Sequence, residues 1–376
     1  MKVASIVLNN FKHDNRVLKE CISLQNHGYE VKVLAYLDEG QKEHDIVSGI
    51  EVHRIRLTSK KWSKNRVLQI FKFMEFAMRI FRSYKDFDIY HCNDLNALPI
   101  GIIVKLFANR NVKVVYDAHE HETERNGLSG IEKYVLKVLE RILIRSIDAF
   151  ITVSQGIADD YERLYKINTA LVLNCPIYQP SERTNLLRER LGISSESMIF
   201  LYQGSITFGR GVESTIEAFK SFSNQAKVMV FLGYGPSLDL VIDAANTCDN
   251  IFYYEAVSME ELIAYTSSAD VGLSLIENTC LSYNYSLPNK FFEYMMAGIP
   301  IIATDLFEMG RIVRSEKIGY LIENNSANCI KQVINKISIK DLGSFREQLK
   351  QASLKYCWSN QEKILISTYR SLENTN

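Results

Sequence analysis

The sequence predicts an α/β protein made of two doubly wound, Rossmann-like domains that face a cleft. Short apolar runs alternate with longer amphipathic stretches along the chain, a pattern typical of parallel sheets covered by helices. The pattern is interrupted near Pro176, where an apolar run ends and a polar segment (179–185) follows. A chain of 376 residues is long enough for two domains. We therefore expect a first domain over residues 1–176 and a second over 177–360.

The elements of the first domain follow from its apolar spacing. The short apolar runs are predicted to be strands: Val3–Leu8, Val31–Leu37, Ile50–Ile55, Ile89–Cys92, Val112–Tyr116, Ala149–Val153 and Ala170–Leu173. The longer stretches between them are predicted to be helices: Asn15–His27, Lys64–Tyr84, Leu95–Leu106, Glu132–Ser146 and Gly156–Tyr165. Because helices separate most consecutive strands, we expect the strands to be parallel.

The second domain repeats this alternation. Its predicted strands are Met198–Gln203, Lys227–Gly233, Ile251–Tyr254, Val271–Leu275, Ile299–Ala303 and Gly319–Leu321. Its predicted helices are Val212–Ser223, Ser237–Asn246, Met259–Ser267, Lys290–Ala297, Asn328–Lys336 and Ser344–Tyr356. A last helix is expected from residue 361 to 372, capped at its N-terminus by Ser359-Asn360.

Composition excludes several classes of protein. Basic and acidic residues are equal in number, 44 of each, so no overall positive field would attract nucleic acid. The seven cysteines are scattered without Cys-x-x-Cys spacing, which argues against a disulfide framework or a zinc site and favours a reducing compartment. The first apolar run is too short for a signal peptide, and no run is long enough to span a membrane. We expect a cytoplasmic protein, free or peripheral on the inner face of a membrane.

A glycine-rich turn joins the first strand of the second domain to its first helix. In Tyr202–Gly211, the residues Gly204 and Gly209 would let backbone N–H groups approach a phosphate, and Arg210 could hold it through several donors. Ser205 lies in the same turn. The glycine spacing is that of a nucleotide P-loop, but Arg-Gly replaces Lys-Ser/Thr and disfavours that motif. The alternative is a tight turn without a ligand.

The most informative segment is 286–300, SLPNKFFEYMMAGIP, which predicts a short helix followed by a buried strand. The helix N-terminus, where Asn289 lies, attracts negative charge. Lys290 can neutralise a phosphate, and Glu293 can accept hydrogen bonds from ribose hydroxyls. The alternative is that Lys290 and Glu293 form a solvated pair on the helix surface.

The run 114–121, VVYDAHEH, ends an expected strand of the first domain in a polar cluster. Polar residues at the carboxyl end of a strand face the ligand in this architecture, so His119 and Glu120 are candidate site residues. Two alternatives remain open: a structural role for His119, or a metal bound by His119 and His121 with His91. The spacing is not His-Glu-x-x-His and no cysteine accompanies it, so we expect no metal.

Two other strand ends carry polar residues toward the same side of the first domain. Asp14 and Arg16 follow the first strand, and Asp94 follows the fourth, beside His91 and Asn93. Asp14 is equally well placed to cap the next helix.

Basic residues gather in Lys60–Arg66, which leads into a helix with interleaved aromatic and basic residues. Such a segment can lie on an anionic membrane, so we expect a possible peripheral membrane contact through Lys60–Arg66. The alternative is that the apolar face of this helix packs on the sheet.

These segments resemble, in wording and order, the retaining glycosyltransferases of the GT-B type, family 4, also called glycosyl transferases group 1. The resemblance covers essentially the whole chain, and its most specific part is the segment Lys290–Gly298 in its order after the Arg210 turn. Two positions depart from the family pattern. Ser205 stands where the first of two phosphate-binding cations is usual, and Tyr285 stands where the first of two glutamates is usual.

The resemblance implies a fold, an activity and a set of roles. Residues 361–376 would cross back onto the first domain, and a sugar would pass from a nucleoside-diphosphate sugar of the UDP or GDP type to a glycan or lipid-linked acceptor. This would serve bacterial surface polysaccharide or glycoconjugate synthesis, with no cofactor and no metal. Arg210 and Lys290 would stabilise the leaving diphosphate, while His119 approaches the transferred sugar. The donor would contact Gly204, Ser205, Gly209, Gly233, Gly235, Asn289 and Glu293, and the acceptor would lie near Asp14, Arg16, Asp94 and Glu120.

Two other functions fit the same fold. A non-hydrolysing sugar-nucleotide epimerase would need carboxylate acid and base groups in the cleft, which the sequence does not clearly supply. A non-catalytic GT-B partner protein would be consistent with Ser205 and Tyr285 at positions where charged residues are usual.

Overall fold

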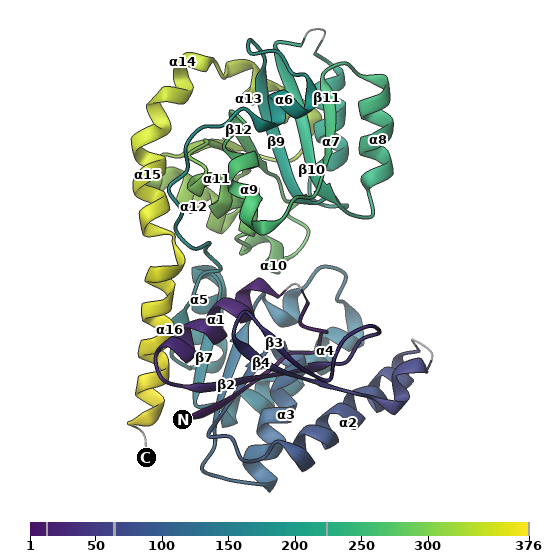
Figure 1. Cartoon of the computed structure of the whole chain (residues 1–376), viewed down its shortest axis with the longest axis vertical. Coiled ribbons are helices and arrows are strands. Elements are labelled where there is room, and N and C mark those ends of the chain that lie inside the picture. Colours follow the sequence, from purple (N-terminus) through teal and green to yellow (C-terminus); the bar gives the residue numbers. More distant parts are fainter. Residues whose placement is uncertain (13, 63–64, 223–224, 375–376) are drawn as a thin grey trace. The chain divides into compact units, whose positions relative to one another are not determined.

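The computed structural model describes residues 1–12, 14–62, 65–222 and 225–374. The chain divides into two compact units (Figure 1). Unit 1 comprises Met1–Val172 and Gln361–Asn376, and unit 2 comprises Leu173–Asn360. The division thus falls shortly before Pro176 and the polar segment 179–185, and the chain returns to unit 1 at its last helix.

Unit 1 is built on an eight-stranded sheet in the order β3-β4-β2-β1-β5-β6-β7-β8, in which β3 is antiparallel to β4 and the other pairs are parallel. Its strands are β1 (Lys2–Ile6), β2 (Glu30–Tyr36), β3 (His44–Val47), β4 (Ile50–Ile55), β5 (Ile89–Asn93), β6 (Lys113–Ala118), β7 (Ala149–Thr152) and β8 (Thr169–Leu171). Its helices are α1 (Asn15–Asn26), α2 (Arg66–Ser83), α3 (Asp94–Phe107), α4 (Gly130–Leu143) and α5 (Gln155–Tyr165), with short 3-10 turns at Thr58–Lys61, Glu122–Glu124 and Ile144–Ser146.

Unit 2 is built on a six-stranded parallel sheet in the order β11-β10-β9-β12-β13-β14. Its strands are β9 (Met198–Ser205), β10 (Lys227–Tyr234), β11 (Ile251–Glu255), β12 (Val271–Ser274), β13 (Ile301–Thr304) and β14 (Gly319–Ile322). Its helices are α6 (Leu186–Leu191), α7 (Val212–Lys220), α8 (Leu238–Thr247), α9 (Met259–Thr266), α10 (Leu281–Asn284), α11 (Asn289–Met296), α12 (Phe307–Glu316), α13 (Ala327–Lys336), α14 (Ile339–Leu342) and α15 (Arg346–Lys355), with a 3-10 turn at Gly343–Phe345. The helix α16 (Trp358–Glu373) then leads into unit 1.

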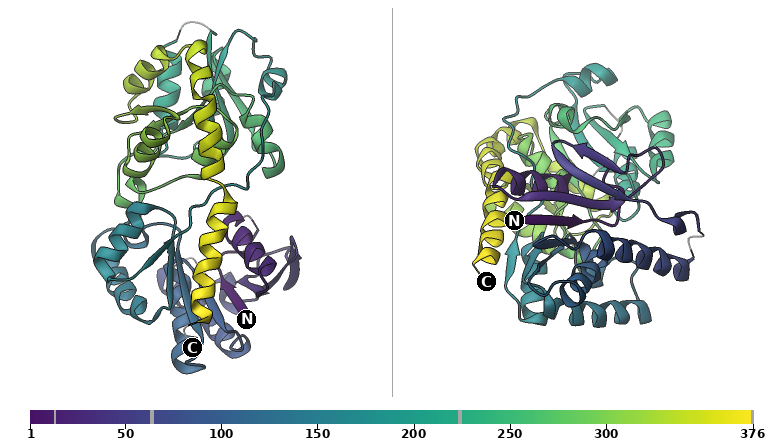
Figure 2. Two further views of the ribbon diagram at one scale, coloured as in Figure 1. Left: turned by 90° about the vertical axis from the view of Figure 1, so that its left-hand side faces the viewer. Right: turned by 60° about the horizontal axis from the view of Figure 1, so that its bottom comes forward.

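The two faces of the unit 1 sheet are covered by different helices. Successive side chains of a strand point to opposite faces. On β6, Tyr116 bonds to α4 while Asp117 bonds to α1, and on β5 His91 bonds to Tyr369 of α16. Helices α1 and α16 therefore cover one face and α4 lies on the other (Figure 2).

Each sheet has one point where the strand order changes direction, between β1 and β5 in unit 1 and between β9 and β12 in unit 2. Open α/β sheets bind ligands at the carboxyl ends of the strands beside such a point. The residues that follow β1, β5 and β6, and those that follow β9, are the candidates identified from the sequence.

The sequence analysis did not predict the strand β3 or the helix α12, and the structure shows a local feature of each. The strand β3 pairs with β4 through a tight turn in which Ser48 (φ 49°) and Gly49 (φ 85°) both adopt left-handed backbone conformations, as two-residue hairpin turns require. The helix α12 contains Gly310, an unfavourable residue for a helix interior. A Cβ atom at Gly310 would lie 2.2 Å from a carboxylate oxygen of Asp305, so a larger residue here would displace that side chain.

The predicted cap of the last helix is wrong. Helix α16 begins at Trp358, so Ser359 and Asn360 lie inside it. The Asn360 amide instead donates to the carbonyl oxygens of Leu354 (2.9 Å) and Lys355 (3.1 Å), and thereby satisfies the end of the preceding helix α15. The predicted helix ends at Lys64 and Ser223 fall outside the described residues.

Candidate functional site

The glycines at the ends of β9 and β10 allow two loops of unit 2 to approach each other. Gly204 (φ 94°), Gly233 (φ 153°) and Gly235 (φ 150°) all have left-handed backbone conformations. A Cβ atom at Gly233 would lie 2.0 Å from the Gly204 carbonyl oxygen, and one at Gly235 would lie 2.2 Å from that of Ile206. Gly233 and Gly235 are therefore required for chain packing, whereas at Gly204 only the positive φ favours glycine.

Lys290 lies at the start of α11, buried with 9% of its surface exposed. Its ammonium sits 3.4 Å from the centroid of the Tyr202 ring. Among the residues that the structure describes, none gives this ammonium a hydrogen-bond partner. Burial holds the pKa of Lys290 well below its ordinary value, and the nearby charge of Arg210 lowers it further against the opposing effect of Glu293. The alternative of a solvated pair with Glu293 is therefore wrong.

Arg210 belongs to the glycine-rich turn that precedes α7. Its guanidinium lies 4.7 Å from the centroid of the Tyr283 ring, and it is half-buried. The carbonyl of the neighbouring Gly209 (φ 74°) accepts a hydrogen bond from the Glu277 N–H at 3.0 Å. Two cations, Arg210 and Lys290, thus come close enough within unit 2 for the charge of one to affect the other.

The remaining donor-side residues lie around α11 and the end of β9. Glu293 accepts a hydrogen bond of 2.5 Å from the Gln203 amide, whose oxygen accepts one of 2.8 Å from the Thr266 hydroxyl. Asn289, at the first position of α11, accepts a hydrogen bond of 2.8 Å from the Asn174 amide. Ser205 is exposed. The sequence analysis missed Gln203 and Tyr202, because both read as ordinary residues of a strand.

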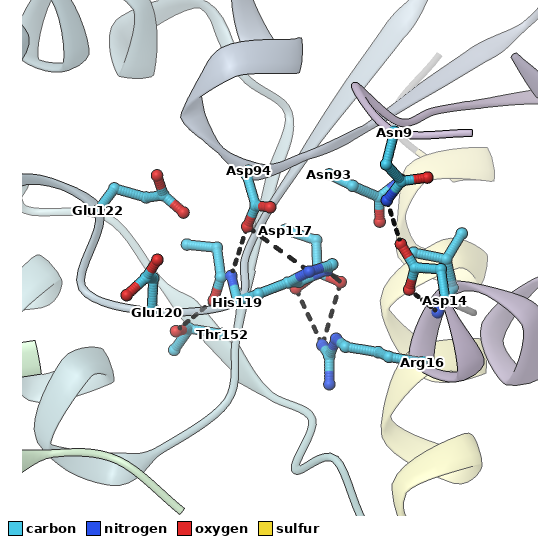
Figure 3. A network of polar contacts seen from close by, with 12 residues as sticks. Asn9, Asp14, Arg16, Asn93, Asp94, Asp117, His119, Glu120, Glu122 and Thr152 are labelled. Carbon is cyan, nitrogen blue, oxygen red and sulfur yellow. Dashed lines mark hydrogen bonds and ion pairs between the residues drawn. The ribbon is translucent and has the colours of Figure 1, made fainter. Parts of the chain in front are cut away.

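His119 follows β6 in unit 1 and lies between two carboxylates (Figure 3). Its ring Nε2 is 3.2 Å from Asp117 Oδ2, its Nδ1 is 3.5 Å from Asp94 Oδ1, and its backbone N–H donates to the same Asp94 oxygen at 3.1 Å. Burial lowers the pKa of His119, but Asp94 and Asp117 outweigh burial and raise it to about 10. His119 is therefore an imidazolium at neutral pH.

The cation expected to face the acceptor, Arg16, is instead buried inside unit 1, with 5% exposed. It donates two hydrogen bonds to Asp117 (2.9 and 3.0 Å) and one to the Val172 carbonyl (2.9 Å), and it pairs with Glu20 at 3.0 Å. Arg16 therefore does not lie at the surface, where an acceptor contact was expected. We interpret it as a positioning residue. It neutralises the carboxylate that holds His119.

The other three residues predicted on the acceptor side are Asp14, Asp94 and Glu120. The Asp14 carboxylate caps α1 by accepting from the Val17 N–H at 3.3 Å, which confirms the capping alternative. Asp94 has a left-handed backbone (φ 66°) at the start of α3, a conformation that aspartate tolerates better than most residues. Glu120 is half-exposed, 3.6 Å from Arg125.

Glu122 is a buried residue that the sequence analysis missed. Its carboxyl is fully buried, and burial together with the charge of Asp94 raises its pKa well above the ordinary value. Arg125 lies 3.6 Å away and acts in the opposite sense. The sequence offers no signal for this burial, because His-Glu-Thr-Glu is polar and reads as an exposed loop.

The residues proposed as an alternative metal site are held by other partners. His121 bonds to Asp160 at 2.8 Å, and His91 bonds to the Tyr369 hydroxyl at 2.7 Å. In the described part of the chain, ligand atoms of Glu20, Asp117 and His119 lie within 4.8 Å of one another. Arg16 pairs with both of those carboxylates, and burial raises the pKa of Glu20 to about 7, so this group is a poor cation site.

The basic segment Lys60–Arg66 is described only in part. Lys60 pairs with Asp38 at 2.6 Å, so its charge is already neutralised, while Trp62 is half-exposed. Ser63 and Lys64 lie outside the described residues. Of the helices that the structure describes, none has the length and apolar character needed to cross a bilayer.

Two doubly wound sheets of this order, joined by a last helix that returns to the first, define the GT-B class of glycosyltransferase. Residues 15–175 match the family Glycosyltransferase Family 4, and residues 184–356 match the family Glycosyl transferases group 1. One match lies in each half of the chain and together they span most of it. The chain therefore belongs to these glycosyltransferase families and is a glycosyltransferase.

Individual relatives agree with this assignment. An uncharacterized glycosyltransferase of Methanocaldococcus jannaschii is 22% identical over 92% of this chain and 91% of its own length. The chitobiosyldiphosphodolichol beta-mannosyltransferase of Candida albicans is 20% identical over 98% of this chain and 87% of its own. Among solved structures, sucrose-phosphate synthase from Thermosynechococcus elongatus superimposes over both whole chains with a TM-score of 0.81 and 16% identity. Anabaena HepE in complex with UDP-glucose gives 0.76 with 13% identity over 99% of this chain and 100% of its own. These structures share the fold.

Proposed function

We propose that the protein is a retaining, metal-independent glycosyltransferase that takes a sugar from a UDP- or GDP-type donor bound by unit 2. The acceptor, a glycan or a lipid-linked sugar, would bind beside His119 of unit 1. Such an enzyme would serve bacterial surface polysaccharide or glycoconjugate synthesis as a cytoplasmic protein. The structure of the relative HepE with UDP-glucose supports a nucleotide-sugar donor.

The observation that carries the proposal is the pair Lys290 and Arg210. A buried ammonium without a hydrogen-bond partner among the described residues is costly, and a second cation nearby increases the cost. A diphosphate would remove both penalties, because it brings negative charge and many acceptor oxygens. Arg210 also lies in a turn where Gly204, Gly209 and Gly211 have positive φ, a backbone form that can direct N–H groups toward a phosphate.

The same two cations can assist the chemical step. The acceptor hydroxyl oxygen forms a bond to the anomeric carbon while the bond from that carbon to the diphosphate oxygen breaks. The electron pair stays on the diphosphate, where Lys290 and Arg210 face the growing charge. A phosphate oxygen on the same face takes the acceptor proton, so the new bond keeps the configuration of the old one. His119, as a cation held by two carboxylates, would lie beside the transferred sugar.

The test is a thermal-shift screen of UDP, GDP and their sugars, followed by transfer assays with each stabilising donor. We expect one nucleoside diphosphate to raise the melting temperature. Arg210→Gln and Lys290→Ala should each abolish most of that rise, while Lys340→Ala, at an exposed lysine of α14, should retain it. Nuclear magnetic resonance of the product gives the anomeric configuration. An inverted product would refute the retaining mechanism, and binding without transfer to any acceptor would favour a non-catalytic partner protein.

A further inference from the structure

Two glutamates of unit 1, Glu122 and Glu140, are fully buried in opposite surroundings. The Glu140 carboxylate accepts hydrogen bonds from three phenol hydroxyls. These belong to Tyr116 (2.8 Å), Tyr161 (2.5 Å) and Tyr165 (2.8 Å). Among the described residues, none donates a hydrogen bond to either oxygen of Glu122. Because a buried charge without donors is costly, the surroundings of Glu140 suit a carboxylate and those of Glu122 do not.

The groups around Glu122 are already engaged elsewhere. One guanidinium nitrogen of Arg125 lies 3.6 Å from Glu122 and equally far from Glu120. Both distances are too long for a hydrogen bond, and the charge is shared between two carboxyls. Tyr116 and Tyr161 lie close enough for the charge of Glu122 to affect them, but each gives its single hydroxyl proton to the other buried glutamate.

The neighbour toward which Glu122 points is Asp94 (Figure 3). The two carboxyl groups form a side-chain hydrogen bond. Two carboxylates can only accept, so this bond requires a proton on one of them. Asp94 is 39% exposed and faces the cation His119, whereas Glu122 is fully buried, so the proton belongs on Glu122. In agreement, burial and the charge of Asp94 raise the pKa of Glu122 well above its ordinary value.

We propose that Glu122 is a positioning residue for His119, a neutral carboxylic acid that donates a hydrogen bond to Asp94. This bond fixes the Asp94 carboxylate where it accepts the His119 N–H (3.1 Å) and faces ring Nδ1 (3.5 Å). Asp117 lies 3.2 Å from the other ring nitrogen, so both sides of the ring are supported. An active site can keep a buried acid neutral so that it donates a hydrogen bond. The consequence for sugar transfer rests on the proposed function, whereas the hydrogen bond does not.

The first test reads the charge of Glu122 directly. The full chain, without ligand, is labelled with ¹³C at the glutamate side-chain carboxyls, and the signal that disappears in Glu122→Gln identifies the residue by nuclear magnetic resonance. We expect the signal of a carboxylic acid at pH 7, and a carboxylate signal at that pH would overturn the proposal. Glu124, in the same 3-10 turn, pairs with Lys133 and Lys137 and should give the carboxylate signal as an internal control.

The second test asks whether the donor on Glu122 acts on His119. Glu122→Gln keeps a donor on an uncharged side chain, whereas Glu122→Leu keeps a similar volume and donates nothing. Titration of the His119 ring should give a midpoint of about 10 in the original protein and in Glu122→Gln. In Glu122→Leu the midpoint should fall by about one unit or more, because a carboxylate that is no longer held in place stabilises the imidazolium less. Glu124→Gln is the matched control and should leave the midpoint unchanged.

Two results of this titration would overturn the proposal. Equal midpoints in all variants would mean that Glu122 only fills space. An equal fall in Glu122→Gln and Glu122→Leu would mean that the negative charge of Glu122 acts, and not its proton. Cooperative thermal unfolding of Glu122→Leu separates a lost contact from a lost fold, and the carboxyl signal of the original protein does not depend on that variant.

Both tests use the protein without ligand, so they are independent of the donor screen. Where sugar transfer is measured, Glu122→Leu should lower kcat about tenfold to a hundredfold and Glu122→Gln should restore it, because misplaced groups slow the chemical step. Stabilisation by a nucleoside diphosphate should be unchanged in both variants, since Lys290 and Arg210 are untouched. An unchanged kcat in Glu122→Leu would refute the positioning role. A failed donor screen would refute the proposed function and leave the hydrogen bond to Asp94 standing.

Discussion

The two units hold buried charges in opposite ways. In unit 1, Arg16 pairs with Asp117 and Glu20, and His119 lies between Asp94 and Asp117, so each cation has an acidic partner. In unit 2, Lys290 lies over an aromatic ring, and its burial, together with the charge of Arg210, lowers its pKa.

The difference shows what each unit is prepared for. Paired charges hold one another in place. Arg16, Glu20, Asp94 and Asp117, which we call the unit 1 cluster, are therefore a preorganised support for His119. Lys290 of unit 2 has no such carboxylate bonded to its ammonium among the described residues, and under the proposed function a diphosphate would supply the missing charge and recover the unfavourable energy as binding energy. The predictions below test this contrast, from the largest expected effect to the smallest.

The largest effect should come from breaking the balanced cluster of unit 1. Asp117→Asn removes the charge that accepts two hydrogen bonds from buried Arg16 and leaves that guanidinium underpaired. We expect the free energy of unfolding to fall by about 3–5 kcal/mol, measured by urea denaturation. Asp86→Asn, at an exposed position, is the control and should leave the midpoint unchanged. A change in Asp117→Asn as small as that of the control would mean that the cluster is not structurally required.

The corresponding substitution in unit 2 should raise the free energy of unfolding instead of lowering it. Lys290→Met replaces a buried ammonium by an apolar side chain of similar length, and should stabilise the ligand-free protein by about 1–3 kcal/mol. The same variant should lose the stabilisation that a nucleoside diphosphate gives to the original protein. Differential scanning calorimetry with and without the nucleotide measures both effects. A destabilised ligand-free variant would contradict the idea that this cation is held at a cost.

The pH dependence of stability should also differ in sign between the units. The pKa of His119 is raised to about 10, so its contribution is fully present below its unfolded pKa of about 6.5 and is lost as pH rises through 10. The pKa of Lys290 is lowered, so the folded state loses this proton more readily and stability rises with pH up to the unfolded pKa. The stability difference between the original protein and His119→Gln should therefore shrink from pH 7 to pH 10.5. Titration of the His119 ring by nuclear magnetic resonance checks this directly, and a midpoint near 6.5 would refute it.

The smallest effect should come from the contact that α16 makes with the unit 1 cluster. Tyr369→Phe removes the hydroxyl that bonds to His91 at 2.7 Å but keeps the ring that packs on Tyr29. We expect a loss of about 0.5–1.5 kcal/mol in the free energy of unfolding, by urea denaturation. Thr368→Val, at an exposed hydroxyl of the same helix that bonds only to its own backbone among the described contacts, is the control. If both variants lost the same free energy of unfolding, the hydrogen bond between Tyr369 and His91 would contribute no more than the control hydroxyl does.

Much of the fold could be predicted because each sheet is made of locally recognisable strands and helices. The predicted helix Gly156–Tyr165 differs from α5 by one residue, and the six strands of unit 2 were all expected. The hairpin of β3 was missed because its turn depends on two left-handed residues, of which Ser48 rarely adopts that conformation. The candidate glycines and Lys290 could be found because their sequence spacing is local.

The partners of the candidate residues could not be predicted, because they come from distant parts of the chain. Asp117 lies 101 positions from Arg16 in the sequence and bonds to it in the interior, so the sequence alone suggested an acceptor contact for Arg16 and not this partner. Lys290 could be identified as a cation beside a helix start, but its burial over Tyr202 depends on how α11 packs on β9. Glu122 and Glu140 were the hardest residues to predict. Both are fully buried, whereas sequence analysis places carboxyl groups on the surface.

The return of the chain to unit 1 constrains the order of events during translation. Residues 361–376 leave the ribosome only after the whole of unit 2, so Tyr369 cannot cover His91 until then. Unit 2 can close around its own sheet while the part of the unit 1 sheet that α16 covers is still exposed. The half of the protein that is synthesised first is therefore the half that matures last, and a nascent chain stalled before residue 361 would expose that face to chaperones.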